Sequence, residues 1–167
     1  MSVVQYLYPA DAKCLNLEDI QEVLATSIPG ASIIDCDSNS KRHATPNWAS
    51  IEVCHPHSVA RSLLCVSQSR PKGLNALCSA FSGNANLLIV RQAKKLVWAQ
   101  LKAPRSISDR KLSCALADHF KILAAVLRRC NGAIHLPENE KLYSAAGFTR
   151  YANRMRGPAS RKMSQLF

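Results

Sequence analysis

The chain has 167 residues, of which 47% are hydrophobic and 20% are charged. A chain of this length fits one domain with a sizeable core, and its apolar content excludes the intrinsically disordered class. The formal net charge of +11 favours partners that are polyanions, acidic proteins or anionic surfaces.

The first 68 residues predict several strands and one clear helix. The helix is expected over 17–28, because Asn16 is a suitable N-cap and apolar residues recur every three or four positions. Residues 58–68 continue either as the second strand of a hairpin or as a helix. β-branched residues or strict alternation predict strands over 3–8, 31–36 and 48–54, with a polar loop between the last two.

The middle of the chain predicts a helix and then two adjacent strands. A short helix is expected over 74–81, closed by Gly83. The continuous apolar run over 85–92 is typical of a central strand, and 94–104 is predicted as its neighbour after a tight turn.

The longest predicted element is a helix over 106–131. Ser106 and Asp109 match a capping box, an apolar stripe includes Phe120, and Gly132 is expected to end the helix in a left-handed conformation. The remaining residues predict a strand over 133–136, a short helix over 138–147 and a basic tail over 148–167.

Strands joined as hairpins, with helices interspersed irregularly, predict an α+β fold. We expect a single domain over 1–156, in which a mixed or mostly antiparallel sheet is packed by two or three helices. A flexible basic tail is expected over 157–167.

The N-terminal residues and the cysteines indicate the compartment. The first thirteen residues lack a basic region and a hydrophobic region, so no targeting segment is predicted, and no apolar run approaches the roughly 20 residues of a membrane span. The seven cysteines contain no C-x-x-C pair. We expect reduced, mostly buried thiols in a cytoplasmic, reducing environment.

Cys54, His55 and His57 are the candidate metal ligands. Thiolate and imidazole suit zinc, and Cys54 beside a histidine could also form a thiol active site. However, the spacing lacks the pairing of zinc motifs, and Cys54 and His55 would point to opposite sides of a strand. A strand end that carries surface histidines explains the same residues, so no metal or cofactor is assigned.

Catalytic motifs are not visible elsewhere in the sequence. None of the six glycines belongs to a phosphate-binding loop, and no paired carboxylates suggest acid–base chemistry. The sequence therefore predicts no catalytic residue and favours a binding protein over an enzyme.

The basic residues are concentrated in the later part of the chain. Residues 1–52 contain seven acids and three bases, a net charge of −4, whereas 53–167 contain four acids and nineteen bases, a net charge of +15. Scattered, solvated bases are one explanation, and a nucleic-acid contact is another, since arginines neutralise phosphates and aromatic rings stack on bases. The predicted basic face comprises Arg91, Lys94, Lys95, Arg150, Tyr151, Arg154, Arg156, Arg161 and Lys162.

The sequence therefore favours a non-enzymatic protein that engages a polyanion, with nucleic acid as the leading ligand. The alternative is an interaction module, of the inhibitor, immunity or effector type, that binds an acidic protein. A thiol or zinc site at Cys54, His55 and His57 is a weaker alternative. The response to salt separates the first two, because binding to polyphosphate falls steeply with salt and binding to a neutral protein surface does not.

Overall fold

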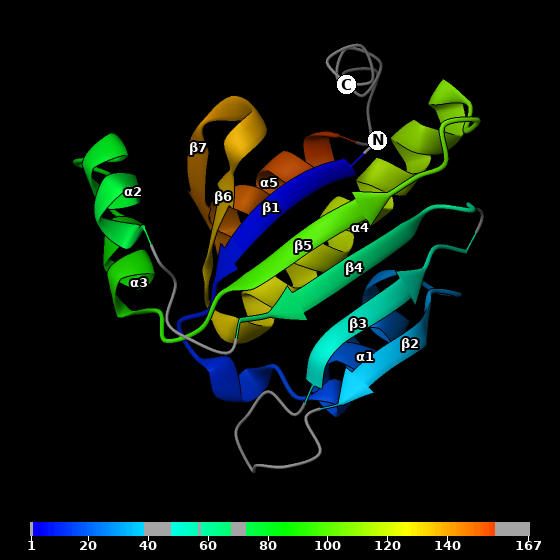
Figure 1. Cartoon of the computed structure of the whole chain (residues 1–167), viewed down its shortest axis with the longest axis horizontal. Coiled ribbons are helices and arrows are strands. Elements are labelled where there is room, and N and C mark those ends of the chain that lie inside the picture. The colour runs from blue at the N-terminus through cyan, green and yellow to red at the C-terminus, as the bar shows by residue number, and fades with distance from the viewer. Residues whose placement is uncertain (1, 39–47, 57, 68–72, 156–167) are drawn as a thin grey trace.

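The computed structural model describes residues 2–38, 48–56, 58–67 and 73–155. Within these ranges, seven strands form one antiparallel sheet in the order β2-β3-β4-β5-β1-β6-β7, and five α-helices pack against it (Figure 1). The predicted α+β class is confirmed. The predicted tail over 157–167 and most of the polar loop before residue 48 lie outside the described residues.

Most of the predicted elements are present with similar bounds. The strands are β1 (Ser2–Tyr8), β2 (Ser32–Ser38), β3 (Trp48–Cys54), β4 (Arg61–Val66), β5 (Val97–Lys102), β6 (Ala133–Leu136) and β7 (Lys141–Ser144). The helices are α1 (Leu17–Ser27), α2 (Leu74–Ala80), α3 (Leu87–Gln92), α4 (Asp109–Cys130) and α5 (Ala145–Arg154), with short 3-10 turns η1 (Ala12–Cys14) and η2 (Pro137–Asn139). No helix in the described ranges is long and apolar enough to cross a membrane.

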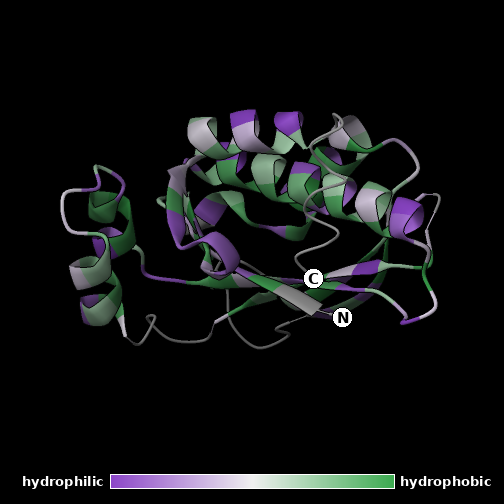
Figure 2. Ribbon diagram, turned by 90° about the horizontal axis from the view of Figure 1, so that it is seen from above, coloured by the Kyte–Doolittle hydropathy of each residue, from purple (hydrophilic) through white to green (hydrophobic). Residues whose placement is uncertain are grey.

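Three helices, α1, α4 and α5, cover one face of the sheet (Figure 2). Helix α4 lies in the middle of this layer and packs against both α1 and α5. Its apolar stripe meets the alternate residues of the strands, such as Val97, Ala99 and Leu101 of β5, all of which are buried. The main core therefore lies between this helix layer and the sheet, and the fully buried Phe120 is one of its largest members.

The ends of α4 differ from those predicted. Ser108 is the N-cap residue and makes no side-chain capping bond, so the capping box of Ser106 and Asp109 is wrong. At the other end Asn131, with φ of 46°, adopts the left-handed conformation that was expected of Gly132. Gly132 is required for space instead, because a Cβ there would lie 2.7 Å from the carbonyl oxygen of Tyr8.

Residues 87–92 form helix α3, so the strand predicted over 85–92 is wrong. Leu87 and Val90 are buried and lie three positions apart. The residues that directly follow them, Leu88 and Arg91, are exposed. That spacing is helical, but a continuous apolar run hides it, because such a run suits a buried strand equally well.

Residues 141–144 form strand β7, so the helix predicted over 138–147 is also wrong. Helix α5 starts later, where the Ser144 side chain accepts a hydrogen bond of 3.1 Å from the Gly147 amide. This helix includes the first residues of the predicted basic tail. Phe148 is fully buried and Met155 is nearly so, which makes α5 part of the core.

Helices α2 and α3 pack against a corner of the opposite face of the sheet. The amide side chains of Asn84 and Asn86 lie 3.4 and 3.5 Å from the carbonyl oxygen of Leu142, which ties this helix pair to β7. No described helix covers that face over β4 and β5 (Figures 1 and 2). The second apolar cluster that holds the corner contains Tyr8, Leu87, Val90, Ala93, Ala133 and Leu142.

Candidate nucleic-acid interface

The face of the sheet opposite the helix layer displays side chains from β1, β4 and β5. In β5, Val97, Ala99 and Leu101 point into the core, so the alternating residues point the other way. The antiparallel register places residues of β1 and β4 beside them. We call this surface the open face, and its described side chains are Val4, Tyr6, Arg61, Leu63, Cys65, Trp98, Gln100 and Lys102.

Aromatic rings form a row along one border of the open face. Tyr6 pairs with Trp98 across β1 and β5, and such directly opposed residues have Cβ atoms about 4.5–5.5 Å apart. On the other side of Tyr6, the ring of His135 is stacked with a centroid distance of 6.1 Å and an interplanar angle of 23°. Phe81, at the end of α2, meets His135 edge-on at 5.3 Å. We call Trp98, Tyr6, His135 and Phe81 the aromatic row, and each of these side chains is partly exposed.

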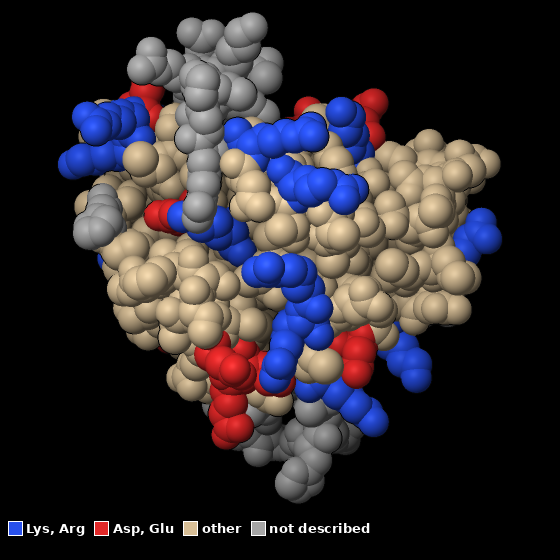
Figure 3. All heavy atoms as spheres, turned by 180° about the vertical axis from the view of Figure 1, so that it is seen from behind, with Lys and Arg blue, Asp and Glu red and all other residues tan. Residues whose placement is uncertain are grey.

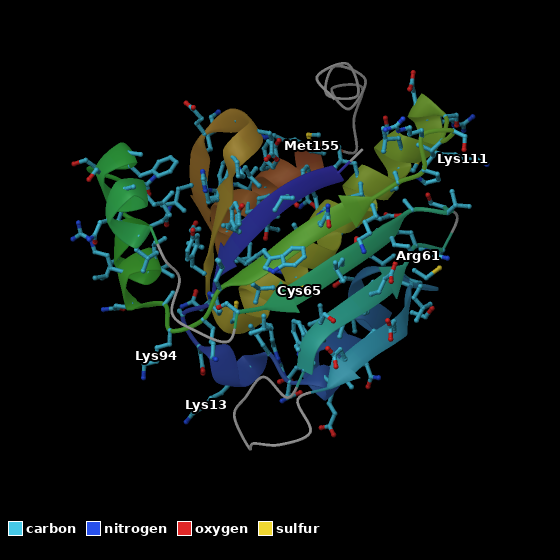
Figure 4. The ribbon with its side chains drawn as sticks, in the orientation of Figure 1. Lys13, Arg61, Cys65, Lys94, Lys111 and Met155 are labelled. Atoms are coloured by element: carbon cyan, nitrogen blue, oxygen red, sulfur yellow. The ribbon has the colours of Figure 1, made fainter. Side chains whose placement is uncertain are left out.

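Two bases lie at the opposite end of the same strands. Lys102 of β5 pairs with Arg61 of β4, four positions along the strand from Trp98, or about 13 Å at about 3.3 Å per residue. The Arg61 guanidinium is held in place by a hydrogen bond of 3.0 Å to the sulfur of Cys54. Figure 4 looks onto this face and shows Arg61 and Cys65 at opposite ends of β4.

The β2–β3 edge of the same side of the sheet is acidic. Asp35 pairs with Glu52, and Glu52 in turn pairs with Leu63 of β4. Asp37 pairs with Ser50 farther along the edge. A polyanion on this side of the sheet would therefore be repelled from β2 and β3 and attracted toward Arg61 and Lys102.

The titratable rings on this side of the sheet are neutral at neutral pH. Burial lowers the pKa of His135 below its ordinary value. Burial, together with the neighbouring Tyr6, raises the pKa of Tyr8 to about 12. Among the described side chains of the open face, Arg61 and Lys102 are thus the groups that carry charge.

The predicted basic face is divided between two sides of the molecule. Arg91 lies on α3, and Lys94 and Lys95 lie in the link between α3 and β5. Arg150 and Arg154 are exposed on α5, which belongs to the helix layer on the covered side. The remaining basic residues of that prediction, Arg156, Arg161 and Lys162, lie outside the described residues.

Tyr151, the aromatic member of the predicted basic face, packs within the helix layer. Its ring lies 5.3 Å from that of Tyr143 and 5.8 Å from that of Phe120, measured between centroids. Burial raises its pKa to about 12. The packing of this ring is what an amphipathic terminal helix requires.

The helix layer carries charges of both signs. Figure 3 looks onto this side and shows bases spread over it, with acids both in its lower part and along its upper margin. Arg129, at the end of α4, forms ion pairs with Asp19 and Glu22 of α1. These acids partly neutralise the bases that a polyanion would need here.

Cys54 and His55 point to opposite sides of the sheet, as the alternation predicts. Cys54 contacts Arg61, whereas His55 is only 2% exposed and turns toward the core, so the expectation that His55 lies on the surface is wrong. His57 lies outside the described residues, and no cluster of three or more potential metal ligands occurs within them.

A chain of hydrogen bonds runs through the core below the open face. The Ser62 hydroxyl lies 2.8 Å from His55 Nε2 and 2.7 Å from His119 Nδ1. His119 Nε2 lies 2.8 Å from Gln5 Oε1, which can only accept. His119 therefore carries its proton on Nε2, Ser62 donates to Nδ1 of His119, and His55 donates from Nε2 to Ser62.

His55 and His119, the two histidines in this series of hydrogen bonds, are both neutral. Burial, assisted by the nearby His55, lowers the pKa of His119 to about 3, and burial also lowers the pKa of His55. A serine hydroxyl beside a histidine can act as a nucleophile with the histidine as its base. Ser62 is fully buried, however, so no substrate reaches its hydroxyl in this structure, and the chain links β1, β4 and α4 instead.

No protein-family model matches the chain, and comparisons with curated proteins and with solved structures found no significant match. The candidate interface therefore rests on the geometry of the open face.

The site residues predicted from the sequence include none of the aromatic row, and they include neither Arg61 nor Lys102, although both bases fall within the range 61–111 that was expected to contribute to the basic face. The alternation of β5 carries part of the signal, since Trp98, Gln100 and Lys102 fall on one side and three small or aliphatic residues on the other. Tyr6, His135 and Arg61 join them only through the pairing of distant strands, and Phe81 joins through its contact with His135.

Proposed function

We propose that the chain is a non-enzymatic protein that binds single-stranded nucleic acid on the open face. The observation that carries this proposal is that the aromatic row and the bases Arg61 and Lys102 lie on the same face of the sheet, about 13 Å apart along β5 between Trp98 and Lys102. No described helix covers that face over β4 and β5. Single strands bind proteins by stacking bases on aromatic side chains while basic groups neutralise phosphates. The net charge of +11 adds long-range attraction.

Unpaired bases suit this surface better than a duplex does. The bases of a duplex stack on one another, so their faces are not available to Trp98 or Tyr6. The acids Asp35 and Glu52 would repel phosphates at the β2–β3 edge. We therefore expect the strand to lie over β4, β5 and β1.

The test is a titration of labelled oligouridine and of a duplex hairpin of equal length, followed by fluorescence anisotropy. Wild type should bind the single strand more tightly. Trp98→Ala should weaken that binding by about 1–3 kcal/mol, the contribution of one stacked base, whereas Trp98→Phe should retain most of it. Leu88→Ala, on the exposed side of α3, is the matched control and should bind like wild type.

Intrinsic fluorescence gives an independent measurement in the same titration. Trp48, the other tryptophan, is 1% exposed and donates from its indole nitrogen to the carbonyl of Leu15 at 2.7 Å. Quenching by stacked bases should therefore come from Trp98 and disappear in Trp98→Phe.

Three outcomes would count against the proposal. The first is no binding below about 100 μM at low salt, where even non-specific nucleic-acid binders register. The second is equal affinity for the duplex, and the third is unchanged binding by Trp98→Ala. The first outcome would favour a protein partner that contacts the half-buried Val4 and Leu63 instead. The second would remove the preference for single strands, and the third would place the nucleic acid away from the aromatic row.

A further inference from the structure

A pocket of about 500 Å³ lies where α2 meets the border of the open face. Sites for small molecules typically measure roughly 300–1,000 Å³ and are lined mainly by apolar and aromatic groups. This pocket has that character, with three rings from the sheet and aliphatic side chains from α2 and its surroundings. Its walls include Tyr6, Tyr8, His135, Leu74, Leu77 and Leu96.

Among the described residues that line the pocket, none has a charged side chain. Lysine, arginine, aspartate and glutamate are not among the lining residues. At neutral pH His135 and Tyr8 are uncharged as well, for the reasons given above. An ionic group that entered would lose part of its water shell without gaining a charged partner among these described residues, so they suit a neutral ligand.

Polar groups in the walls can still orient such a ligand. Tyr8 is 5% exposed, and none of the hydrogen bonds between described residues uses its hydroxyl. That hydroxyl stays protonated, so it can both donate and accept, as can the neutral imidazole of His135. A ligand with flat apolar faces and polar edges would use both kinds of group.

We propose that this pocket holds one nucleobase of the strand that binds the open face. The inference rests on the proposed function, because the base arrives on the bound strand. Tyr6 connects the two sites, since it belongs to the aromatic row and is also a wall of the pocket. A strand that stacks on Trp98 and Tyr6 therefore places its next base at the pocket.

The experiment fills the pocket and measures the affinity for labelled oligouridine and oligoadenosine. Ala76 and Ala80 line the pocket from successive turns of α2. Ala76→Trp and Ala80→Trp should each weaken binding about 5- to 150-fold, as the loss of one stacked base does. Ser79→Trp is the matched control, because it adds a tryptophan to the same helix at a position that does not line this pocket.

A second variant, Tyr8→Phe, keeps the ring and removes the hydroxyl. It should lower the affinity several-fold and reduce the difference between oligouridine and oligoadenosine, because the hydroxyl contacts the edge of the base. Thermal melting identifies any variant that does not fold, and Tyr8→Phe then carries the test alone.

The outcomes separate this inference from the proposed function. If wild type does not bind the oligonucleotides, the proposed function fails. The pocket inference is overturned by a different result, in which wild type binds and the fluorescence of Trp98 is quenched. In that result Ala76→Trp and Ala80→Trp bind like Ser79→Trp, and Tyr8→Phe binds like wild type. The strand would then lie on the open face without using the pocket.

Discussion

The two faces of the sheet use polar and aromatic side chains in opposite ways. On the covered face the polar groups of Gln5, Ser62 and His119 are fully buried and bonded to one another. On the open face the large rings of Trp98 and Tyr6 remain partly exposed. Stability alone favours the reverse arrangement, with rings inside and polar groups in water. The covered face therefore accounts for folding, and the open face departs from what folding requires, which is typical of a functional surface.

The comparison predicts first that stability depends on the covered face. Phe120 is fully buried and contacts the rings of His119, Phe148 and Tyr151, so Phe120→Ala should lower the free energy of unfolding by about 3–5 kcal/mol. Trp98→Ala should cost much less, because the indole is partly exposed. Urea denaturation of both variants checks this, and equal losses would mean that the open face is part of the core.

A second prediction concerns the buried hydrogen-bond chain. Ser62→Ala removes the hydroxyl between His55 and His119 and leaves buried ring nitrogens unpaired, which should cost about 1–3 kcal/mol. Ser79→Ala is the matched control, since Ser79 is exposed and, among the described residues, its hydroxyl donates to the carbonyl of Asn75 within its own helix. A loss at Ser62 no larger than at Ser79 would contradict the assignment of this chain as a stabilising link.

The fold was predictable where local features agree with one another. Helix α1 has both a capping residue, Asn16, and an apolar stripe, and β3 alternates between buried and partly exposed residues from Ser50 to Cys54. Helix α3 was missed because its continuous apolar run has no distinguishing period, and β7 because four residues are too few to show one. Patterns within one element therefore predict that element, provided that the element is long enough to have a pattern.

The candidate site was less predictable, because it depends on contacts between distant segments. The bonds of His119 join residues 57 and 114 positions away, to Ser62 and Gln5 respectively. Tyr6 meets Trp98 only because β1 inserts between β5 and β6. No local pattern reports strand order, so the sequence indicated a basic binding protein but not the surface proposed here.

The third prediction is a loss of stability in mild acid that originates on the covered face. The pKa of His119 is about 3 in the folded protein and near 6.5 in the unfolded protein. Between these two pH values the unfolded protein binds a proton at His119 and the folded protein does not. Above about pH 6.5 this effect costs no stability. As the pH is lowered from there toward 3, the free energy of unfolding decreases by up to about 1.4 kcal/mol per pH unit. His55 shifts in the same direction, with Asp118 opposing and Arg61 assisting.

Chemical denaturation between pH 7.5 and 5 measures this effect. Carboxylates remain largely ionised over that range, so histidines dominate the slope. His119→Gln keeps an amide donor near Gln5 but cannot titrate, and it should show a shallower dependence on pH than wild type. An identical slope in the variant would place the acid sensitivity elsewhere.

The last prediction compares bases on the two sides of the sheet and has the smallest expected effect. Arg61→Ala with Lys102→Ala should reduce the slope of log affinity against log salt for oligouridine by about 0.7 for each lost phosphate contact. Lys13→Ala with Lys111→Ala removes the same charge from exposed positions outside the sheet, at η1 and the start of α4 (Figure 4), and should leave that slope nearly unchanged.

Arg150→Ala with Arg154→Ala completes the comparison, because both residues are exposed on α5 in the helix layer. If the strand lies on the open face, this pair should behave like Lys13 and Lys111, since α5 is separated from that face by the sheet itself. A larger change in slope for Arg150 and Arg154 than for Arg61 and Lys102 would move the ligand to the helix layer. The part of the predicted basic face that lies on α5 would then belong to the binding surface, and the aromatic row would need another explanation.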